Sequence, residues 1–533
     1  MAVSGRGQGG KKHLAVAGAA MLAALAGLAV AAGGETDTAG PREPQAKAQT
    51  RPNIILVTTD DQTMGQLTEA TMPRTLDLLG REGTTFTNAI ATTPLCCPSR
   101  ASMITGQYGH NNGILSNAGG YKHLIGKRNV LPMWLKRAGY RTAHVGRYLN
   151  TYKGDRAAPG WQRWFSMLEP RIYFDYDVQL KNGDEEHFGK RRRNYVTSVI
   201  NKQAVGMARE LVKGPRPFFL QVDHLAPHSD GVGGELGTPC ERSAIPPSHA
   251  ADGFEQVQLP RPPSFDEQDV SDKPTFIQVQ PNLDAEDVSE LERQWRCRLA
   301  SLPSVDAGVG RIYDAIEAAG ELENTAIIFV SDNGFFFGEH RVVREKYHAY
   351  EEAVRIPLMI RFPASVGGAG LTVHAPVANI DIPPTILELA GASPCVPEGC
   401  RVLDGRSLVS LAAAGATDWP FDRPLLVELD RRNSGTGLTL LPCEYHGVRL
   451  DGQLYVEYDS VPNSVTGVCE DSDAVEHYDL AADPFELQNL FPAPQGTGTR
   501  SVQEELAARL AVLRDCAGIE GRDPQPASGH YCE

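Results

Sequence analysis

The sequence lacks several features that would assign the chain to particular classes of protein. It has no excess of positive charge, since 51 lysines and arginines stand against 66 aspartates and glutamates and the formal net charge is −15. General nucleic-acid binding is therefore not expected, because such proteins neutralise phosphates with basic side chains. No internal repeat is evident, which argues against a repeat architecture. No cysteine precedes Cys96, so the N-terminal segment has no lipobox.

The N-terminal segment has the pattern of an export signal. Basic residues precede an apolar run over residues 14–32, and this run ends near an A-x-A cleavage motif. We predict a signal peptide over residues 1–32 and a disordered linker over residues 33–50. The mature protein is then expected to be secreted or to lie in the cell envelope or periplasm. If the run is not cleaved, it would instead act as a membrane anchor.

The cysteine content agrees with export. The chain has ten cysteines, and an even set remains when Cys96 and Cys97 are set aside. An even set in an exported chain indicates disulfide bonds. The sequence does not determine the connectivity. Pairing of near neighbours is plausible for six of the eight remaining cysteines, all except Cys240 and Cys297: Cys395 with Cys400, Cys443 with Cys469, and Cys516 with Cys532.

Three short apolar runs predict strands that are buried on both faces. They cover residues 53–59, 218–222 and 326–330, and each is followed by polar residues. Helical patterns lie between them, for example over residues 309–319. This alternation indicates an α/β fold with a large, mostly parallel central sheet flanked by helices. Because ligands of such folds bind beyond the carboxyl ends of the strands, the polar residues there mark one candidate site.

The C-terminal part of the chain has a different pattern. Residues 453–458 alternate between polar and apolar and follow an Asp-Gly turn, which predicts antiparallel strands. Residues 501–504 form a capping-box pattern, S-x-x-E, that predicts the start of a helix with leucines on one face. We therefore predict a catalytic domain over residues 51–420 and a smaller α+β subdomain, an antiparallel sheet plus a helix, over residues 421–533.

Two pairs of oxygen-bearing side chains follow predicted core strands. Asp60 and Asp61 follow the first strand, and Asp332 and Asn333 follow the third. Hard oxygen ligands of this kind suit Ca²⁺ or Mg²⁺ rather than Zn²⁺. Either pair alone could be ordinary turn chemistry, because these residues favour turns. Two pairs that end two core strands favour a metal site.

The most informative motif is the sequence C-C-P-S-R at residues 96–100. It lies where a polar loop is expected to turn into a helix, so that unpaired main-chain N–H groups lie beside the thiol of Cys96. Such a position favours anions and reactive sulfur. A structural disulfide, a vicinal cysteine pair or a metal ligand are the alternative interpretations of the motif alone.

The chain resembles the type I sulfatases of the alkaline-phosphatase-like superfamily. The motif at 96–100 is their signature, and further motifs resemble the N-acetylglucosamine-6-sulfatase and heparan 6-O-endosulfatase branch. The resemblance covers nearly the whole mature chain and implies the α/β fold described above. The further motifs are G-R-Y-L-N at 146–150, L-P-R-P-P at 259–263, S-D-K-P at 271–274, S-D-N-G at 331–334 and Y-D-L-x-x-D-P at 478–484.

The resemblance implies a role for each candidate residue. Cys96 would be oxidised after translation to formylglycine (3-oxoalanine), whose hydrate is the nucleophile. A calcium ion, with magnesium as the second choice, would be held by a set of five residues: Asp60, Asp61, Cys96, Asp332 and Asn333. The other catalytic roles fall on basic side chains: Arg100 orients the hydrate, Arg147 and Lys346 bind sulfate oxygens, and His228 helps to protonate the leaving alcohol.

Two positions need separate comment. The family usually has lysine where this chain has Arg147, and a planar guanidinium does not readily release a proton. An acid role for that position is therefore in doubt. His110 lies inside the extended signature over residues 105–110, and the resemblance gives it no definite role.

The implied reaction is hydrolysis of a sulfate monoester. One hydroxyl of the hydrate would attack sulfur, and the second would then lose a proton and expel sulfate. The expected partners are a sulfated carbohydrate or another sulfate ester, in particular 6-O-sulfate on a glucosamine-type sugar, and a formylglycine-generating enzyme during maturation. A phosphonate monoester or phosphodiester hydrolase using the same site is one alternative. A non-catalytic binder of sulfated glycans is the other, if Cys96 is unmodified.

Overall fold

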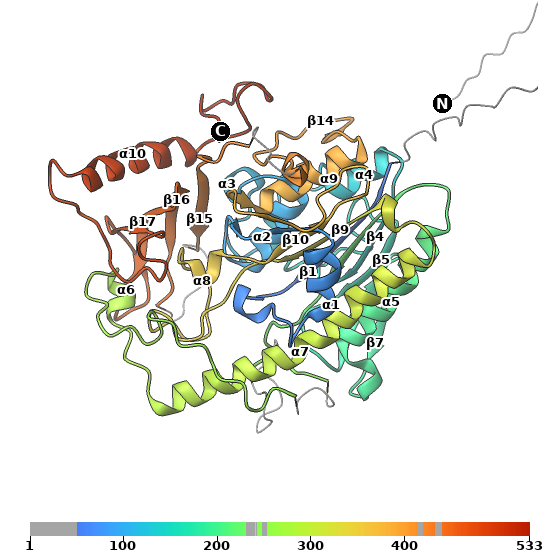
Figure 1. The fold of residues 1–533 in the computed structure, drawn as a ribbon, viewed down its shortest axis with the longest axis horizontal. Coiled ribbons are helices and arrows are strands. Elements are labelled where there is room, and N and C mark those ends of the chain that lie inside the picture. The colour runs from blue at the N-terminus through green and yellow to red at the C-terminus, as the bar shows by residue number, and fades with distance from the viewer. Residues whose placement is uncertain (1–50, 231–239, 241, 248–252, 414–418, 432–439) are drawn as a thin grey trace, which may run out of the picture. The chain divides into compact units, whose positions relative to one another are not determined.

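The computed structural model describes residues 51–230, 240, 242–247, 253–413, 419–431 and 440–533 (Figure 1). Its main element is a sheet of ten strands, in the order β11 (Leu371–Val373), β2 (Thr84–Phe86), β10 (Leu358–Arg361), β9 (Thr325–Ser331), β1 (Asn53–Thr59), β8 (Phe218–Asp223), β4 (Arg141–Gly146), β5 (Arg163–Met167), β6 (Tyr176–Leu180) and β7 (Glu185–Phe188). The five strands from β9 to β5 in this order are all parallel to their neighbours. The prediction of a mostly parallel central sheet is confirmed.

The middle of the sheet consists of the three strands that the sequence predicts. β1 lies between β8 and β9, and every residue of these strands is buried. Alternate residues point to opposite faces, so that Ile54 packs in one core cluster and Ile55 in another. At the carboxyl edge, Thr58 lies opposite Asp223 on one side and Val330 on the other. This register brings the polar residues that follow the strands to one place.

Helices cover both faces of the sheet. One face is covered by two helices that pack side by side (Figure 1): α5 (Val196–Val212) and α7 (Ala285–Glu317). The other face is covered by three helices: α2 (Cys96–Thr105), α4 (Leu131–Arg137) and α9 (Ile382–Ala390). The sheet is therefore buried between two helical layers, which explains why its middle strands read as continuous apolar runs.

Helix α7 is longer than the sequence pattern indicates. The helix predicted at 309–319 is its C-terminal part, and the helix continues N-terminally to Ala285. Its first N–H groups are capped by the side chain of Asp284. Pro303 lies inside the helix. Proline removes one helical hydrogen bond, so the helical sequence pattern is interrupted at this position. Packing against α5 and the sheet nevertheless keeps the chain helical.

The C-terminal part forms a second, smaller sheet with a helix, as predicted. Its strands are antiparallel: β15 (Leu425–Asp430), β16 (Glu444–Leu450), β17 (Gln453–Pro462), β18 (Cys469–Asp471) and β19 (Val475–Asp479). Asp451 and Gly452 join β16 to β17 with φ of 50° and 73°. Positive φ at both positions is typical of a tight hairpin turn, so the Asp-Gly pattern correctly located it.

The predicted start of the C-terminal helix is wrong by one turn. Helix α10 (Gly498–Leu513) begins before Ser501, and its N-cap is Thr497, whose hydroxyl accepts a hydrogen bond from the Arg500 N–H at 3.3 Å. Ser501 therefore lies in the first turn and does not cap the helix. Both hydroxyl residues are competent caps, and the structure uses the earlier one. The leucines of α10 point inward as expected: Leu506, Leu510 and Leu513 are buried.

The small sheet packs against loops and short elements that adjoin the large sheet. One core cluster contains Tyr108 and Tyr350 from the region of the large sheet together with Val427, Tyr458 and Leu510. The described residues from Arg51 to Glu533 form one compact unit. The division between a domain at 51–420 and a subdomain at 421–533 therefore stays a prediction, although the first strand of the small sheet begins just after this boundary.

Four disulfide bonds are present among the described residues. They join the three pairs of near neighbours, Cys395–Cys400, Cys443–Cys469 and Cys516–Cys532, together with Cys240–Cys297. The prediction of disulfides is thus confirmed. Cys96 and Cys97 are free and buried.

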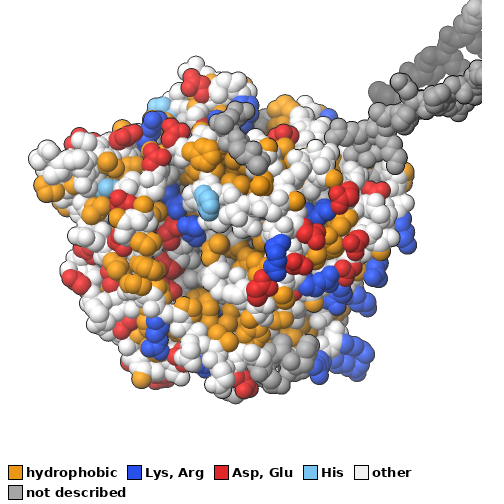
Figure 2. All heavy atoms as spheres, viewed as in Figure 1, with side chains coloured by type: hydrophobic (Ala, Val, Ile, Leu, Met, Phe, Trp, Pro, Cys, Tyr) orange, Lys and Arg blue, Asp and Glu red, His pale blue; other side chains and the backbone are white. Residues whose placement is uncertain are grey.

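The predicted signal peptide at 1–32 and the predicted linker at 33–50 lie outside the described residues. Within the described part of the chain, no helix has both the length and the hydrophobicity needed to cross a membrane. On the face shown in Figure 2, acidic and basic side chains are interspersed and do not form one continuous basic surface. This distribution agrees with the net charge of −15.

Candidate active site

The candidate residues lie at the carboxyl edge of the large sheet. Asp60 and Asp61 directly follow β1, Asp332 and Asn333 follow β9, and Arg147 follows β4. His228 lies in the segment after β8, Cys96 is the first residue of α2, and Lys346 lies in the loop over residues 332–350. Several of them line a cavity of about 420 Å³: Asp61, Cys96, Arg147, His228 and Lys346. The tertiary structure thus gathers residues that are up to 286 positions apart, from Asp60 to Lys346.

Cys96 lies against the aspartate pair. Its Sγ atom is 3.6 Å from Asp60 Oδ1 and 3.9 Å from Asp61 Oδ1, and it accepts a hydrogen bond from Lys346 Nζ at 3.1 Å. Burial raises the pKa of the Cys96 thiol to about 12, although the Lys346 ammonium acts in the opposite direction. An unmodified cysteine here is therefore a protonated thiol at neutral pH.

Arg100 is fully enclosed by carboxylates. One turn after Cys96 on α2, its guanidinium contacts Asp332 at 2.8 Å, Asp60 at 3.2 Å and Asp223 at 3.2 Å. The side chain is 3% exposed, so these ion pairs are shielded from water. A guanidinium whose donors are fixed in this way holds the carboxylates and the start of α2 in one geometry.

Two more basic side chains complete the positive lining. Lys346 Nζ contacts the Asp61 carboxylate, and the Arg147 guanidinium contacts Asp60. Burial by itself would lower the pKa of Lys346, but the neighbouring acidic groups, Asp61 first among them, together outweigh burial and raise the pKa. Burial lowers the pKa of Arg147 to about 9. Both side chains are therefore cationic at neutral pH.

His228 presents one ring nitrogen to the cluster. Its Nδ1 lies 2.6 Å from the carbonyl oxygen of Ser229, and its Nε2 lies 3.7 Å from Asp61 Oδ2. The carbonyl can only accept, so the proton of the neutral ring is assigned to Nδ1 and Nε2 is left with a lone pair. Burial, together with the charges of Lys346 and Arg147, lowers the pKa of His228 well below its usual value.

The cluster contains a candidate set of metal ligands. One ligand atom from each of Asp60, Asp61, Cys96 and His228 lies within 4.8 Å of the others. Asn333 contacts the cluster through Nδ2, which donates to Asp61 Oδ1 at 2.7 Å, and its buried amide oxygen, Oδ1, has no hydrogen-bond partner among the described residues. An unsatisfied buried oxygen of this kind is costly unless a cation or another donor meets it. Together with Asp332, the set offers the carboxylate and amide oxygens that calcium prefers.

Two buried residues of this site have contacts that the sequence did not predict. Asp223 ends β8 and accepts hydrogen bonds from His144 Nε2 at 2.9 Å and from Gln221 Nε2 at 2.9 Å while it contacts Arg100. Arg298, on α7, donates to the main-chain oxygen of Asp61 and stacks over Phe335, 4.2 Å from the ring centre. Asp223 is the polar end of a predicted strand and was expected near the site without a role of its own, whereas Arg298 lies in the part of α7 before the predicted helix, where no local signal marks it.

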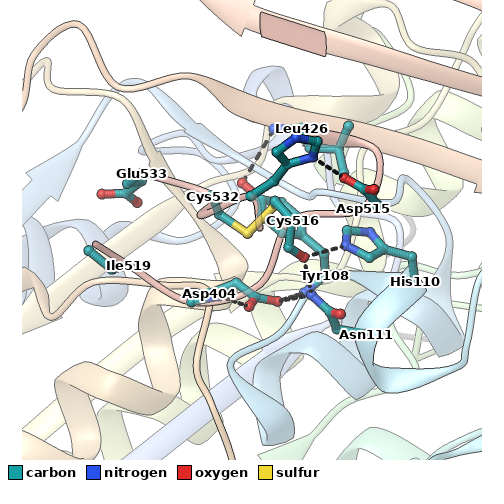
Figure 3. The surroundings of a disulfide bond; sticks show 12 residues. Tyr108, His110, Asn111, Asp404, Leu426, Asp515, Cys516, Ile519, Cys532 and Glu533 are labelled. Atoms are coloured by element: carbon teal, nitrogen blue, oxygen red, sulfur yellow. Dashed lines mark hydrogen bonds and ion pairs between the residues drawn. A yellow bond between two sulfur atoms is a disulfide. The ribbon is translucent and has the colours of Figure 1, made fainter. Parts of the chain in front are cut away.

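His110 lies away from this cluster of residues. Figure 3 shows it on the short helix α3 (Gly109–Asn112), pointing toward the loop that carries the Cys516–Cys532 disulfide. Its Nδ1 is 2.9 Å from Glu428 Oε2, and its Nε2 is 2.9 Å from the carbonyl oxygen of Cys516. The geometry gives His110 a structural role, tying the signature segment to the C-terminal part of the chain.

The environment of His110 predicts a stability effect that depends on pH. Burial would lower its pKa, but the carboxylate of Glu428 outweighs burial and raises the pKa to about 9. Because the folded pKa lies above the unfolded value of about 6.5, the stabilisation is fully present below that value and is lost as the pH rises through about 9. We expect His110→Asn to cost roughly 2 kcal/mol of unfolding free energy at pH 6 and clearly less at pH 9.5.

Urea unfolding of the wild type and of His110→Asn at these two pH values measures the difference. His123→Asn, at an exposed position, serves as the matched control and is expected to show no such change. A cost for His110→Asn that is equal at both pH values would show that the imidazolium charge contributes nothing.

The fold and the site together define an α/β protein with a site for an anionic group at the carboxyl edge of a parallel sheet. The chain matches the sulfatase family model over residues 52–392, and it therefore belongs to the sulfatase family. The N-acetylglucosamine-6-sulfatase of Capra hircus is 29% identical to it, over 90% of this chain and 86% of that protein. The extracellular sulfatase SULF-1 homolog of Drosophila melanogaster is 31% identical over 403 residues, which are 74% of this chain.

The solved structures include close matches to the same fold. The structure of BT4656 in complex with its substrate D-glucosamine-2-N,6-O-disulfate has a TM-score of 0.67 and 25% identity, and the match covers 87% of this chain and 97% of that one. The similarity of the whole fold confirms the predicted architecture. The matched region spans only 34% of the Drosophila melanogaster relative.

Proposed function

We propose that the protein hydrolyses sulfate monoesters, with 6-O-sulfate on a glucosamine-type sugar as the substrate class. The observation that carries this proposal is the position of Cys96 at the N-terminal end of α2, in contact with Asp60, Asp61 and the Lys346 ammonium. A helix N-terminus and buried cations both stabilise an anionic group held there. Membership of the sulfatase family supports the same reaction.

The proposal includes conversion of Cys96 to formylglycine by a formylglycine-generating enzyme. The hydrated aldehyde supplies one hydroxyl that can attack sulfur and a second whose deprotonation releases sulfate. The unmodified thiol is a weak nucleophile in this place, because its pKa of about 12 keeps it protonated at neutral pH. Conversion therefore explains why a buried cysteine begins the helix at the centre of the site.

Asp60, Asp61, Asp332 and Asn333 would hold the calcium ion, together with the modified residue at position 96. The ion supplies positive charge for the oxygens of the bound sulfate group. The unpartnered Oδ1 of Asn333 and the oxygen-rich ligand set support this assignment. A magnesium ion fits less well, because it demands a stricter octahedral geometry.

The basic side chains divide the remaining work. Lys346 and Arg147 line the cavity and bind the sulfate oxygens, which holds the ester in line for attack. Arg100 is occupied by three carboxylates and acts by fixing the orientation of residue 96. Nε2 of His228 carries the lone pair of the neutral ring, so it must take up a proton before it can pass one to the oxygen of the leaving alcohol.

The size and lining of the cavity support a sugar substrate. Its volume of about 420 Å³ lies within the range of roughly 300–1,000 Å³ that is usual for small-molecule sites. Asn117 and Asn150 line it beside the basic residues and offer hydrogen bonds suited to sugar hydroxyls. The N-acetylglucosamine-6-sulfatase relative and the BT4656 complex with a disulfated glucosamine support the 6-O-sulfate class.

We further propose that the protein acts outside the cytoplasm, as a secreted protein or in the cell envelope or periplasm. Four disulfide bonds support an oxidising compartment. The predicted signal peptide and the extracellular sulfatase relative support the same location. A membrane attachment would require that the N-terminal segment stays uncleaved.

A comparison of kcat/KM on matched esters tests the proposed reaction. The protein is produced together with a formylglycine-generating enzyme and is assayed on N-acetylglucosamine 6-sulfate and on phenyl phosphonate esters. We expect a preference of at least about 100-fold for the sulfate ester, because the chain belongs to the sulfatase family. A faster reaction with the phosphonate would favour the alternative hydrolase. Binding of the sulfated sugar without turnover, by protein with an intact Cys96 thiol, would favour the non-catalytic binder.

A further inference from the structure

A second group of metal-competent side chains lies outside the candidate active site. His340, Glu352 and Glu486 each offer one ligand atom, and these three atoms lie within 4.8 Å of one another. His340 comes from the loop at 332–350, Glu352 from α8 (Glu351–Val354) and Glu486 from the segment after β19. Two residues on either side of one loop segment therefore meet a third that lies far away in the sequence.

The atoms that face one another in this group have no hydrogen-bond partners among the described residues. They are His340 Nε2, Glu352 Oε2 and Glu486 Oε1. The His340 and Glu486 side chains are fully buried, with 0% exposure. His340 Nε2 lies 3.8 Å from Glu352 Oε2, which is too long for a hydrogen bond. Buried polar atoms are normally satisfied, so three such atoms at one place indicate a missing cation.

The other nitrogen of His340 is already fixed by a carboxylate. Its Nδ1 lies 2.6 Å from Glu267 Oε2, and the carboxylate can only accept there. The neutral ring then carries its proton on Nδ1 and presents the lone pair of Nε2 to Glu352 and Glu486. A histidine that donates to a carboxylate on one side and binds a metal on the other is a recurrent arrangement in metal sites.

The neighbouring cations are already engaged with other carboxylates. Glu351 contacts Arg355 at 2.6 Å and Arg449 at 3.0 Å, and Glu267 contacts Lys273 at 3.4 Å. In the described part of the chain, no arginine or lysine forms an ion pair with Glu352 or Glu486. Two carboxylates with no arginine or lysine partner, one buried and one 17% exposed, are expensive to hold this close together, which is a further reason to expect a positive ion between them.

We propose that His340, Glu352 and Glu486 form a second metal site that binds a divalent transition ion, with Zn²⁺ as the preferred ion. One imidazole nitrogen and two carboxylate oxygens are typical zinc ligands, whereas calcium takes oxygen ligands. Zinc ligands about 2.1 Å from the ion lie roughly 3.4 Å apart, so the observed 3.8 Å between Nε2 and Oε2 needs only a small side-chain movement.

The ion has a path to this site from the surface. Glu352 lines a cavity of about 530 Å³. Trp295, Phe337 and Phe485 line the same cavity. The Glu352 side chain is 17% exposed, while the other two ligands are closed off. A water molecule entering by the same cavity can complete a four-coordinate ion.

The position of the site gives the ion a structural task. Glu486 belongs to the C-terminal part of the chain, whereas His340 and Glu352 flank the segment that carries Lys346. An ion shared by the three ligands would therefore join the C-terminal part to the loop whose ammonium contacts Asp61. Two residues of that loop, Arg341 and Arg344, have φ of 62° and 60°, which is an unfavourable backbone conformation for them. An ion that holds both ends of the loop would help to maintain this conformation.

Zinc titration of the full chain tests the proposal. The protein carries Cys96→Ala, so that the first site offers no thiol, and it is saturated with calcium before zinc is added. We expect one zinc ion per chain, and a loss of affinity of more than about 100-fold in Glu486→Gln, which keeps the shape and removes the charge. Glu267→Gln is expected to weaken binding by about 10–100-fold, because an amide oxygen is a weaker acceptor than a carboxylate for the Nδ1 proton of His340.

Glu476→Gln is the matched control. Glu476 is an equally buried carboxylate of β19, but its oxygens accept hydrogen bonds from Tyr350, Tyr458 and Tyr478. It is expected to leave zinc affinity unchanged. If Glu486→Gln does not fold, the melting temperature of the parent with and without zinc, together with Glu267→Gln, decides the question. Absence of zinc binding by the parent, or equal affinity in parent and Glu486→Gln, would overturn the proposal whatever the enzyme's activity on sulfate esters.

Discussion

Replacing Cys96 with alanine is expected to lower kcat/KM for sulfate ester hydrolysis by about 10⁴-fold or more, down to the background of the assay. The change removes the only group in the cavity that can become the proposed nucleophile, while the metal ligands and cations remain. Cys96→Ser is expected to lose nearly as much, because a serine cannot form a hydrate with two hydroxyls. Steady-state rates on N-acetylglucosamine 6-sulfate measure both variants.

Cys97→Ser provides the matched control for this prediction. Cys97 is the next residue of α2 and is also a free, buried thiol, but it does not line the cavity. Its replacement is expected to retain most of the activity. In the wild type, mass spectrometry of the peptide around residue 96 should show a loss of about 18 Da from the conversion of CH₂SH to CHO. Substantial turnover by Cys96→Ser would contradict the proposed mechanism.

Replacing Asp332 with asparagine is expected to reduce calcium affinity and activity together, with a loss of roughly 1,000-fold in kcat/KM. The substitution keeps the size of the side chain and removes one carboxylate charge from the ligand set. It also weakens the 2.8 Å ion pair between Arg100 Nε and Asp332 Oδ2. Calcium content of the purified protein and rates at several calcium concentrations measure the two effects separately.

Asp306→Asn controls for the loss of a buried carboxylate as such. Asp306 lies on α7, is 5% exposed, and accepts hydrogen bonds from the Thr75 N–H at 2.7 Å and the Thr75 hydroxyl at 2.8 Å. Its replacement is expected to lower stability but to leave the calcium content unchanged. A normal calcium content in Asp332→Asn would remove Asp332 from the proposed ligand set. Partial recovery of Asp332→Asn at high calcium would support its place there.

The general fold could be predicted because local patterns specify its main elements. The short, continuous apolar runs at 53–59 and 326–330 are typical of strands whose two faces are both covered. Both runs are fully buried strands in the structure. Asp451 and Gly452 marked a hairpin because their types tolerate positive φ. Helix boundaries were less accurate, since several residues near Ser501 can cap a helix and packing selects one of them.

The candidate site could be predicted in its parts but not in its contacts. The position of Asp60 and Asp332 after core strands indicated that they meet, because parallel strands end at the same edge of a sheet. Nothing local indicated that Arg298, in the middle of a long helix, donates to the main chain of Asp61. His110 is the opposite case. It lies close to Cys96 in the sequence, within the signature motif, but its side chain contacts Glu428 and Cys516 in the C-terminal part of the chain.

By itself, the sequence indicated the candidate site residues and the disulfides: the cysteine that begins a helix, the acidic ends of two core strands, and the even set of cysteines. Only the tertiary structure decided which atoms face one another, from the three carboxylates around Arg100 to the convergence of His340, Glu352 and Glu486. The physical reason is that hydrophobic periodicity and turn chemistry act over a few residues. Contacts across hundreds of residues depend on strand order and on the paths of loops, which no local pattern encodes.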